Sequence, residues 1–158
     1  MVAPGIEPPT APARPYAARV DFYVLPASGK NERLVFACRL AEKAFDLGQR
    51  TYIHAESEEQ STQLDNLLWT FRQGSFLPHA LYGAENDDEL PIHIGWQSEP
   101  EAYDVLINLA PKVPAFFDRF ARVAEIVDTD ESVKQAARER FRFYREHGIT
   151  PESHTLES

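Results

Sequence analysis

The sequence VLINLA at residues 105–110 carries the clearest indication of the fold. Its side chains are apolar at almost every position, whereas a strand with one face in water alternates apolar and polar residues. A strand that is apolar on both faces is typical of a parallel sheet covered by helices on both sides. The stretch therefore predicts an α/β protein with a buried central strand.

Strands and helices alternate on both sides of this stretch. Towards the N-terminus we expect strands at 18–25, 50–55 and 92–96, and helices at 32–48 and 57–71. Residues 74–91 are expected to form a loop with a short apolar centre. Towards the C-terminus we expect a helical turn within 111–120, a strand at 121–128 and a last helix at 129–148. This order predicts a mostly parallel sheet with helices on both faces.

Residues typical of helix ends support these boundaries. Asn31, Ser57, and either Thr129 or Asp130 stand where N-caps are expected. Gly48 and Gly148 stand where the first and last helices should end.

The 158 residues favour one domain, which we place at 18–149. Residues 1–17 contain five prolines and are expected to form a disordered tail, and residues 150–158 a flexible polar tail. No apolar run approaches the length of a membrane span, and the N-terminus does not resemble a signal peptide. The lone Cys38 is expected in the core, which suits a reducing cytoplasm.

Motifs of catalysis and cofactor binding are missing. The turn after the first strand, LPASGKNE at 25–32, has one glycine, so it matches neither a dinucleotide fingerprint nor a phosphate-binding P-loop. The five histidines lack metal-ligand spacing, and the acidic run at 85–90 is typical of a solvated loop. We therefore expect no catalytic residue, no metal and no cofactor.

Residues 132–148, SVKQAARERFRFYREHG, differ from the rest of the chain. The protein has a net charge of −9, yet residues 134–145 hold five cations and one acid. On a helical wheel, four of these cations fall within about 80° of one another: Lys134, Arg138, Arg142 and Arg145. Phe141 lies between this cationic stripe and the apolar side of the helix, while Arg140 points elsewhere and is expected to be structural.

The cationic stripe suits a short ligand with several carboxylates and one apolar group. Arginine forks bind carboxylates with two hydrogen bonds, and the apolar group would lie against Phe141. A solvated charged helix with no ligand is the plain alternative. A module for single-stranded nucleic acid is another, although the net charge disfavours it. A small nucleotide-dependent enzyme is a third, against which the missing glycine-rich turn counts.

The same C-terminal segment, DESVKQAARERFRFYREHGI, resembles the last helix of the chi subunit family of bacterial DNA polymerase III holoenzyme. DFYVL, LDNLLWTF, SFLPHALYG and PIHIGW resemble that family in the same order, and the match covers about residues 19–149. The resemblance implies a Rossmann-like three-layer sandwich and a non-catalytic subunit of the clamp-loader assembly. Its partners would be single-stranded-DNA-binding protein, the psi subunit and, indirectly, DNA, with no membrane.

The resemblance also implies two binding surfaces. The first would hold the acidic, phenylalanine-ended C-terminal tail of single-stranded-DNA-binding protein. Family positions for it match here at Lys134, Arg138, Phe141, Arg142 and Arg145, flanked by Val127, Gly148 and Ile149. Relatives have Tyr at position 141 and Lys at position 142. The second would bind psi through Trp69, Phe76, Leu77 and Pro78, unless these residues only close the edge of the core.

Overall fold

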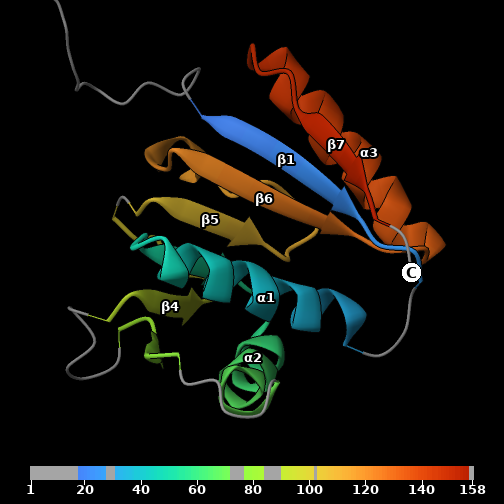
Figure 1. Cartoon of the computed structure of the whole chain (residues 1–158). Coiled ribbons are helices and arrows are strands. Elements are labelled where there is room, and N and C mark those ends of the chain that lie inside the picture. Colours follow the sequence, from blue (N-terminus) through green and yellow to red (C-terminus); the bar gives the residue numbers. More distant parts are fainter. Residues whose placement is uncertain (1–17, 28–30, 72–76, 84–89, 102, 157–158) are drawn as a thin grey trace, which may run out of the picture.

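The computed structural model describes residues 18–27, 31–71, 77–83, 90–101 and 103–156, and they form one α/β unit (Figure 1). The expected N-terminal tail at 1–17, Phe76 and the acidic run at 85–89 lie outside the described residues.

The sheet has seven strands in the order β3-β4-β2-β5-β6-β1-β7, and each described pairing is parallel. In chain order the strands are β1 (Arg19–Val24), β2 (Thr51–His54), β3 (His79–Leu81), β4 (Ile92–Gly95), β5 (Val105–Asn108), β6 (Arg122–Val127) and β7 (Glu152–Thr155). The apolar stretch at 105–110 supplies β5, the middle strand, as its composition predicts. Parallel strands require crossover connections, which here are mostly helices.

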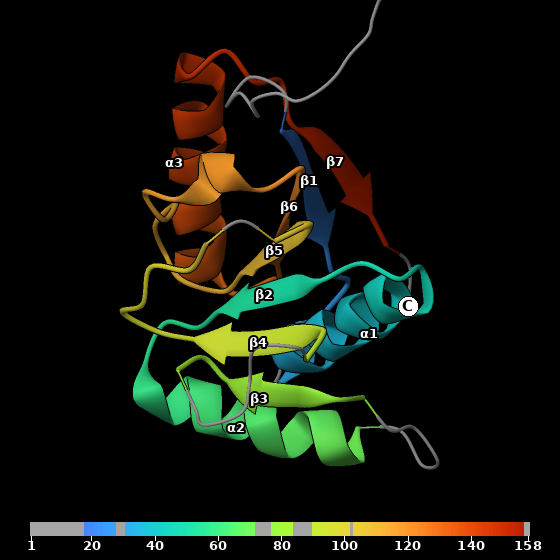
Figure 2. The ribbon, with the colours of Figure 1, turned by 90° about the vertical axis from the view of Figure 1, so that its left-hand side faces the viewer.

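The helices form two layers, one on each face of the sheet. Helices α1 (Glu32–Asp46) and α2 (Glu58–Thr70) lie on one face, and α3 (Glu131–Glu146) lies on the other with the short 3₁₀ helix η2 (Phe117–Arg119) (Figure 2). Each face carries its own cluster of buried apolar side chains. The expected Rossmann-like sandwich with helices on both faces is confirmed.

Local hydrogen bonds explain where the helices begin and end. The Ser57 hydroxyl accepts from the Gln60 amide at 3.1 Å, and the Asp130 carboxylate accepts from the Ser132 amide at 2.9 Å. Gly148 ends α3 with a φ of 82°, a conformation that glycine adopts at little cost. Asn31 differs from the prediction, because its backbone is left-handed and its side chain makes no cap hydrogen bond.

Two strands were not expected. β3 lies within the segment expected to be a loop, and β7 lies within the expected flexible tail at 150–158. β7 pairs with β1 from Asp21 opposite Glu152 to Val24 opposite Thr155, so the prediction of a flexible tail is wrong for residues 152–155. Both strands are short and lie at the two edges of the sheet.

A buried polar cluster joins α3 to the centre of the sheet. Glu125 of β6 accepts hydrogen bonds from Arg140 at 2.7 Å, from Tyr144 at 2.6 Å and from Asn108 at 3.1 Å. Arg140 also donates to the Pro111 carbonyl at 3.1 Å. Burial raises the pKa of Glu125, and these donors oppose that rise. Arg140 is therefore structural, as the helical wheel predicts.

Cys38 lies fully buried among the side chains under α1, and burial raises the pKa of its thiol to about 12. It is a small core residue, as expected.

Among the described residues, no helix has the length and apolar character needed to cross a membrane.

Candidate functional site on helix α3

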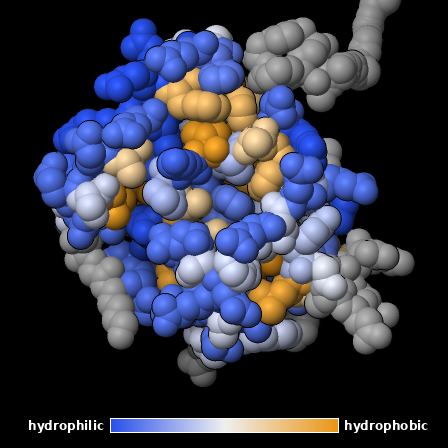
Figure 3. Space-filling model, turned by 180° about the vertical axis from the view of Figure 1, so that it is seen from behind, coloured by the Kyte–Doolittle hydropathy of each residue, from blue (hydrophilic) through white to orange (hydrophobic). Residues whose placement is uncertain are grey.

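The cationic stripe predicted from the sequence lies along one side of α3. Arg138, Arg142 and Arg145 are exposed, while Lys134 and Phe141 are half-buried. Figure 3 shows the face of the molecule on which α3 lies, where hydrophobic patches are surrounded by hydrophilic side chains.

An apolar groove, which we call the α3 groove, runs between α3 and the outer strands of the sheet. It has a volume of about 320 Å³ and is lined by Phe22, Val24, Val127, Lys134, Ala137, Arg138, Phe141 and Ser153. The Phe141 ring packs against Phe22 of β1 with 5.3 Å between ring centroids. Phe141 thus forms one wall of the groove, with its ring packed against the sheet.

A second hollow of about 430 Å³ continues along the helix and is lined by Arg138, Phe141, Arg142, Arg145 and Glu146. Arg138 and Phe141 line both hollows, so all five predicted residues of α3 belong to one continuous surface. The structure thus combines cationic side chains with an apolar groove, as the prediction requires.

Two acids outside residues 134–145 also lie near the stripe. Glu131 lies 3.8 Å from Arg138, which also donates to the Gln135 side chain at 3.0 Å. Glu146 lines the second hollow. Lys134, Arg142 and Arg145 make no ion pair with any described residue. A ligand with carboxylates would therefore compete with Glu131 only at Arg138.

Three residues were expected to flank this surface, and only Val127 lines it. Ile149 is buried in the core, where its amide donates to the Tyr144 carbonyl at 3.0 Å. Gly148 ends the helix and is not among the described residues that line the two hollows. Their structural effect is to direct the chain from α3 towards β7.

The outer strands also contribute to the groove, which the sequence of α3 alone does not predict. Phe22 and Val24 of β1 lie opposite Ser153 and Thr155 of β7, so these positions share the α3 face of the sheet. One feature of the sequence that points to a neighbouring polar strand is the acid Asp21 in the middle of an apolar strand. A carboxylate buried there requires a polar partner, and a polar edge strand can supply one.

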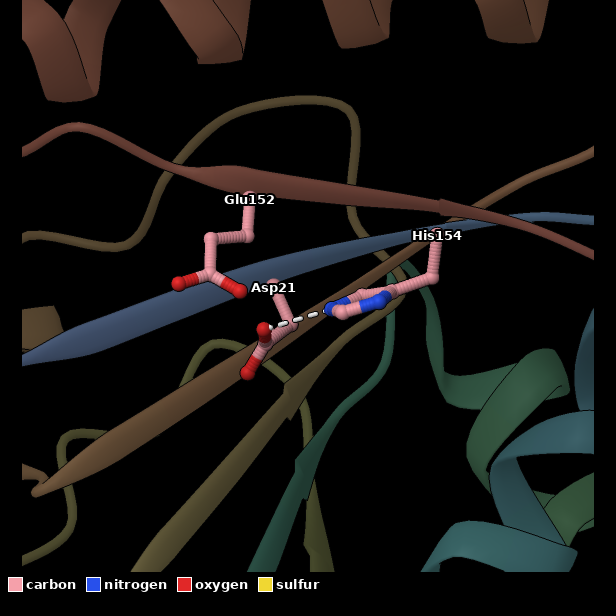
Figure 4. A group of neighbouring side chains, drawn as sticks. All are labelled: Asp21, Glu152 and His154. Carbon is pink, nitrogen blue, oxygen red and sulfur yellow. Dashed lines mark hydrogen bonds and ion pairs between the residues drawn. The ribbon is translucent and has the colours of Figure 1, made fainter.

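The partner of Asp21 is His154 of β7, which lies 2.8 Å away and points towards it (Figure 4). Arg19 and Arg122 also contact the Asp21 carboxylate, at 3.1 Å and 3.2 Å. Glu152 is nearby, and the three residues of Figure 4 could in principle hold a metal ion. The two guanidinium groups already neutralise Asp21, so we interpret the cluster as an ionic anchor for β7.

The Asp21 carboxylate should make stability depend on pH. Burial raises its pKa, but hydrogen bonds from His154 and Arg122 and the charge of Arg19 outweigh burial and lower the pKa overall. A lowered pKa stabilises the fold above the unfolded value near 4 and loses that effect as the pH falls through the folded value. We therefore expect Asp21→Asn to cost about 1–3 kcal/mol of unfolding free energy at pH 7 and much less at pH 3. Urea unfolding at both pH values measures this difference.

Asp46→Asn is the matched control, since Asp46 is exposed and has no ion pair among the described residues. Its effect should stay within about 0.5 kcal/mol at both pH values. A destabilisation by Asp21→Asn that is the same at pH 3 and pH 7 would contradict the ionic anchor.

The described candidates for the second predicted surface differ in how exposed they are. Trp69 at the end of α2 is 47% exposed and packs on His79 with 4.4 Å between ring centroids. Pro78, which precedes His79, is half-buried, whereas Leu77 is 2% exposed and belongs to the core. Only Trp69 and Pro78 are thus accessible among the described candidates.

The fold and the α3 surface together describe a Rossmann-like α/β protein with a groove lined by cationic and aromatic side chains. The family model described as DNA polymerase III chi subunit, HolC, matches residues 18–152. The chain belongs to this family, as the resemblance predicts. The DNA polymerase III subunit chi of Pseudomonas aeruginosa is 47% identical over 139 residues, covering 87% of this chain and 96% of the relative.

More distant relatives have the same description. The DNA polymerase III subunit chi of Haemophilus influenzae is 32% identical and covers 84% of this chain and 93% of the relative. The subunit of Escherichia coli is 35% identical and covers 75% of this chain and 80% of the relative.

Some solved structures share the fold at very low sequence identity. S. cerevisiae Dbp5 bound to Nup159, Gle1, IP6 and ADP matches 97% of this chain with a TM-score of 0.65 and 8% identity. This chain spans only 44% of that Dbp5 chain. T4 UvsW matches with a TM-score of 0.62 and 8% identity, covering 90% of this chain and 42% of that chain. These matches show a shared fold and nothing about activity.

Proposed function

We propose that this protein is a non-catalytic accessory subunit of DNA polymerase III in the cytoplasm, acting in DNA replication. Its α3 groove binds the acidic, phenylalanine-ended C-terminal tail of single-stranded-DNA-binding protein, and the protein links that tail to the clamp loader. The observation that carries the proposal is the placement of four cations beside an apolar groove with an aromatic wall.

Each part of the tail has a matching feature in the groove. Lys134, Arg142 and Arg145 supply positive charge that no described acid neutralises. The terminal phenylalanine would lie in the apolar groove, against Phe141 and the apolar side chains of β1 and β6 that line it. Burying one aromatic side chain and forming two or three charge-assisted hydrogen bonds gives an affinity on the order of micromolar after the costs of association.

The groove favours a peptide over bare nucleic acid. Phosphate binding needs cations, whereas this groove adds an apolar lining beside them. Single-stranded nucleic acid is usually held by aromatic rings exposed for base stacking, and Phe141 is half-buried against Phe22.

We further propose that Trp69 and Pro78 take part in binding the psi subunit or an equivalent clamp-loader component. An exposed tryptophan is a common anchor at protein interfaces. Since Leu77 is buried, its role at this surface is to support the backbone under Pro78.

The proposed function is tested by fluorescence anisotropy with a labelled peptide that ends in several Asp residues and Phe. We expect binding on the order of micromolar that weakens as salt is added, because the contacts are ionic. The same peptide without its terminal Phe should bind at least about tenfold more weakly, since it no longer fills the apolar groove.

A titration with single-stranded DNA in place of the peptide distinguishes the alternative. DNA binding that is tighter than peptide binding would assign the cationic stripe to nucleic acid. A peptide whose affinity is unaffected by loss of the phenylalanine would also contradict the proposed role of the groove.

A further inference from the structure

A second groove, which we call the α1 groove, lies on the opposite face of the sheet from α3. It has a volume of about 350 Å³ and is bounded by α1 on one side and by β1, β5, β6 and Leu156, which follows β7, on the other. In Figure 1, no described helix lies in front of β1, so this side of the sheet lacks the cover that α1 and α2 give to the rest.

Helix α1 has two apolar sides. Ala37, Cys38 and Ala41 are fully buried and pack on the sheet. Phe36, Leu40 and Leu47 recur at helical spacing on another side, and all three line the α1 groove. A surface helix needs only the first apolar side to pack on its own domain.

The second apolar side is only partly covered by the sheet. The Phe36 ring contacts Tyr23 of β1 with 5.4 Å between ring centroids, and Leu156 lines the groove from the end of β7. Leu47 is 64% exposed, which is high for a leucine at the rim of an apolar groove. The exposed leucine therefore has space beside it for a further apolar side chain.

The charges on the rim of the groove have one sign. Arg39 and Lys43 are exposed one helical turn apart, line the groove and make no ion pair with any described residue. Asp21 is the one acid among its lining residues, and Arg19 and Arg122 already neutralise it. On a helical wheel, Glu42 and Asp46 lie on the far side of Arg39 and Lys43 from the apolar residues.

We propose that the α1 groove binds an acidic amphipathic helix of a partner protein. Its apolar residues would pack against Leu40 and Leu47, and its acids would pair with Arg39 and Lys43. Two cations that have no ion pair among the described residues, placed beside an apolar groove, favour an acidic partner. Nucleic acid would leave the apolar side of the groove empty. The site is separate from the α3 groove because the sheet lies between them.

The test uses a fluorescein-labelled peptide of about 15 residues built from Glu, Ala and Leu, with leucines every three or four positions so that they share one helical face. Anisotropy should report binding to the full chain, and a peptide with Lys in place of Glu should not bind. The double variant Lys43→Glu with Leu47→Asp should weaken binding roughly tenfold or more. Both side chains are exposed, so the fold should tolerate the changes.

Lys112→Glu is the matched control, because Lys112 is exposed and lines none of the described grooves. It should leave the affinity unchanged. An excess of unlabelled acidic peptide ending in Phe should not displace the labelled helix, since that peptide is assigned to the α3 groove. This competition also separates failure of the present proposal from failure of the proposed function.

Three outcomes would overturn the proposal. Binding that is unaffected by the double variant, or that is displaced by the peptide ending in Phe, would place the helix elsewhere. A self-association lost in the double variant, measured by sedimentation, would assign the groove to a second copy. If the helix does not bind, and if Leu47→Asp shifts the NMR signals of residues 1–17, the α1 groove would be assigned to the chain's own N-terminal segment.

Discussion

Arg140→Met is expected to lower the free energy of unfolding by about 3–5 kcal/mol, measured by urea unfolding at pH 7. The Arg140 guanidinium lies 2.7 Å from the Glu125 carboxylate, and both side chains are almost completely buried. Methionine keeps much of the side-chain volume but leaves Glu125 charged in the core without a cation. Tyr144 and Asn108 still donate to the carboxylate, but neither carries a charge.

The loss of unfolding free energy caused by Arg140→Met should depend on pH. Burial already raises the pKa of Glu125, and removal of Arg140 takes away a charge that opposes this rise. A carboxyl whose folded pKa lies above its unfolded pKa destabilises the fold at higher pH, and that cost decreases as the pH falls towards the unfolded value near 4. The deficit of Arg140→Met should therefore be smaller at pH 5 than at pH 8.

A second variant separates the charge from the packing. Adding Glu125→Gln to Arg140→Met removes the buried charge while keeping an oxygen that can accept from Tyr144, so the double variant should be more stable than the single one. Arg145→Met, at an exposed position on the same helix, should change stability by no more than about 0.5 kcal/mol. An Arg140→Met protein within about 1 kcal/mol of the parent would show that the pair does not hold α3 to the sheet.

The sequence predicts the centre of this fold better than its edges. Residues 105–108 form the middle strand because burial on both faces requires apolar side chains throughout, and that requirement is visible in the composition. β3 and β7 lie at the edges, where one side of the strand has no neighbour and polar residues are tolerated. β3 has only three residues and β7 is short and polar, so neither carries a clear periodic signal. The first was therefore predicted as a loop and the second as a tail.

In the candidate site, too, the features that depend on one helix could be predicted, and those that depend on the pairing of distant strands could not. The shared face of Lys134, Arg138, Phe141, Arg142 and Arg145 follows from helical geometry alone, and the structure shows it. The contribution of Phe22 and Ser153 to the groove depends on the pairing of β1 with β7, which joins segments about 130 residues apart. Similarly, Arg140 could be assigned a structural role from its angle on the helix, but its partner Glu125 belongs to a strand whose position depends on the whole sheet.

Arg138→Glu is expected to weaken binding of the acidic peptide ending in Phe by at least about 30-fold, corresponding to roughly 2 kcal/mol. Arg138 lines both hollows of the α3 surface, so it can reach the peptide beside the apolar groove and further along the helix. The substitution removes a fork of donors and places a negative charge where the peptide's own acids must lie. Anisotropy titrations at low and moderate salt measure the effect, which should be larger at low salt.

Two further variants make the prediction specific to this contact. Lys112→Glu changes the net charge by the same amount outside the groove, so it should alter the affinity only slightly. Glu131→Gln removes the acid that lies 3.8 Å from Arg138 and should strengthen binding modestly, because the peptide then no longer competes for that guanidinium. If Arg138→Glu and Lys112→Glu weaken binding equally, the peptide responds only to net charge, and the α3 groove is not its binding site.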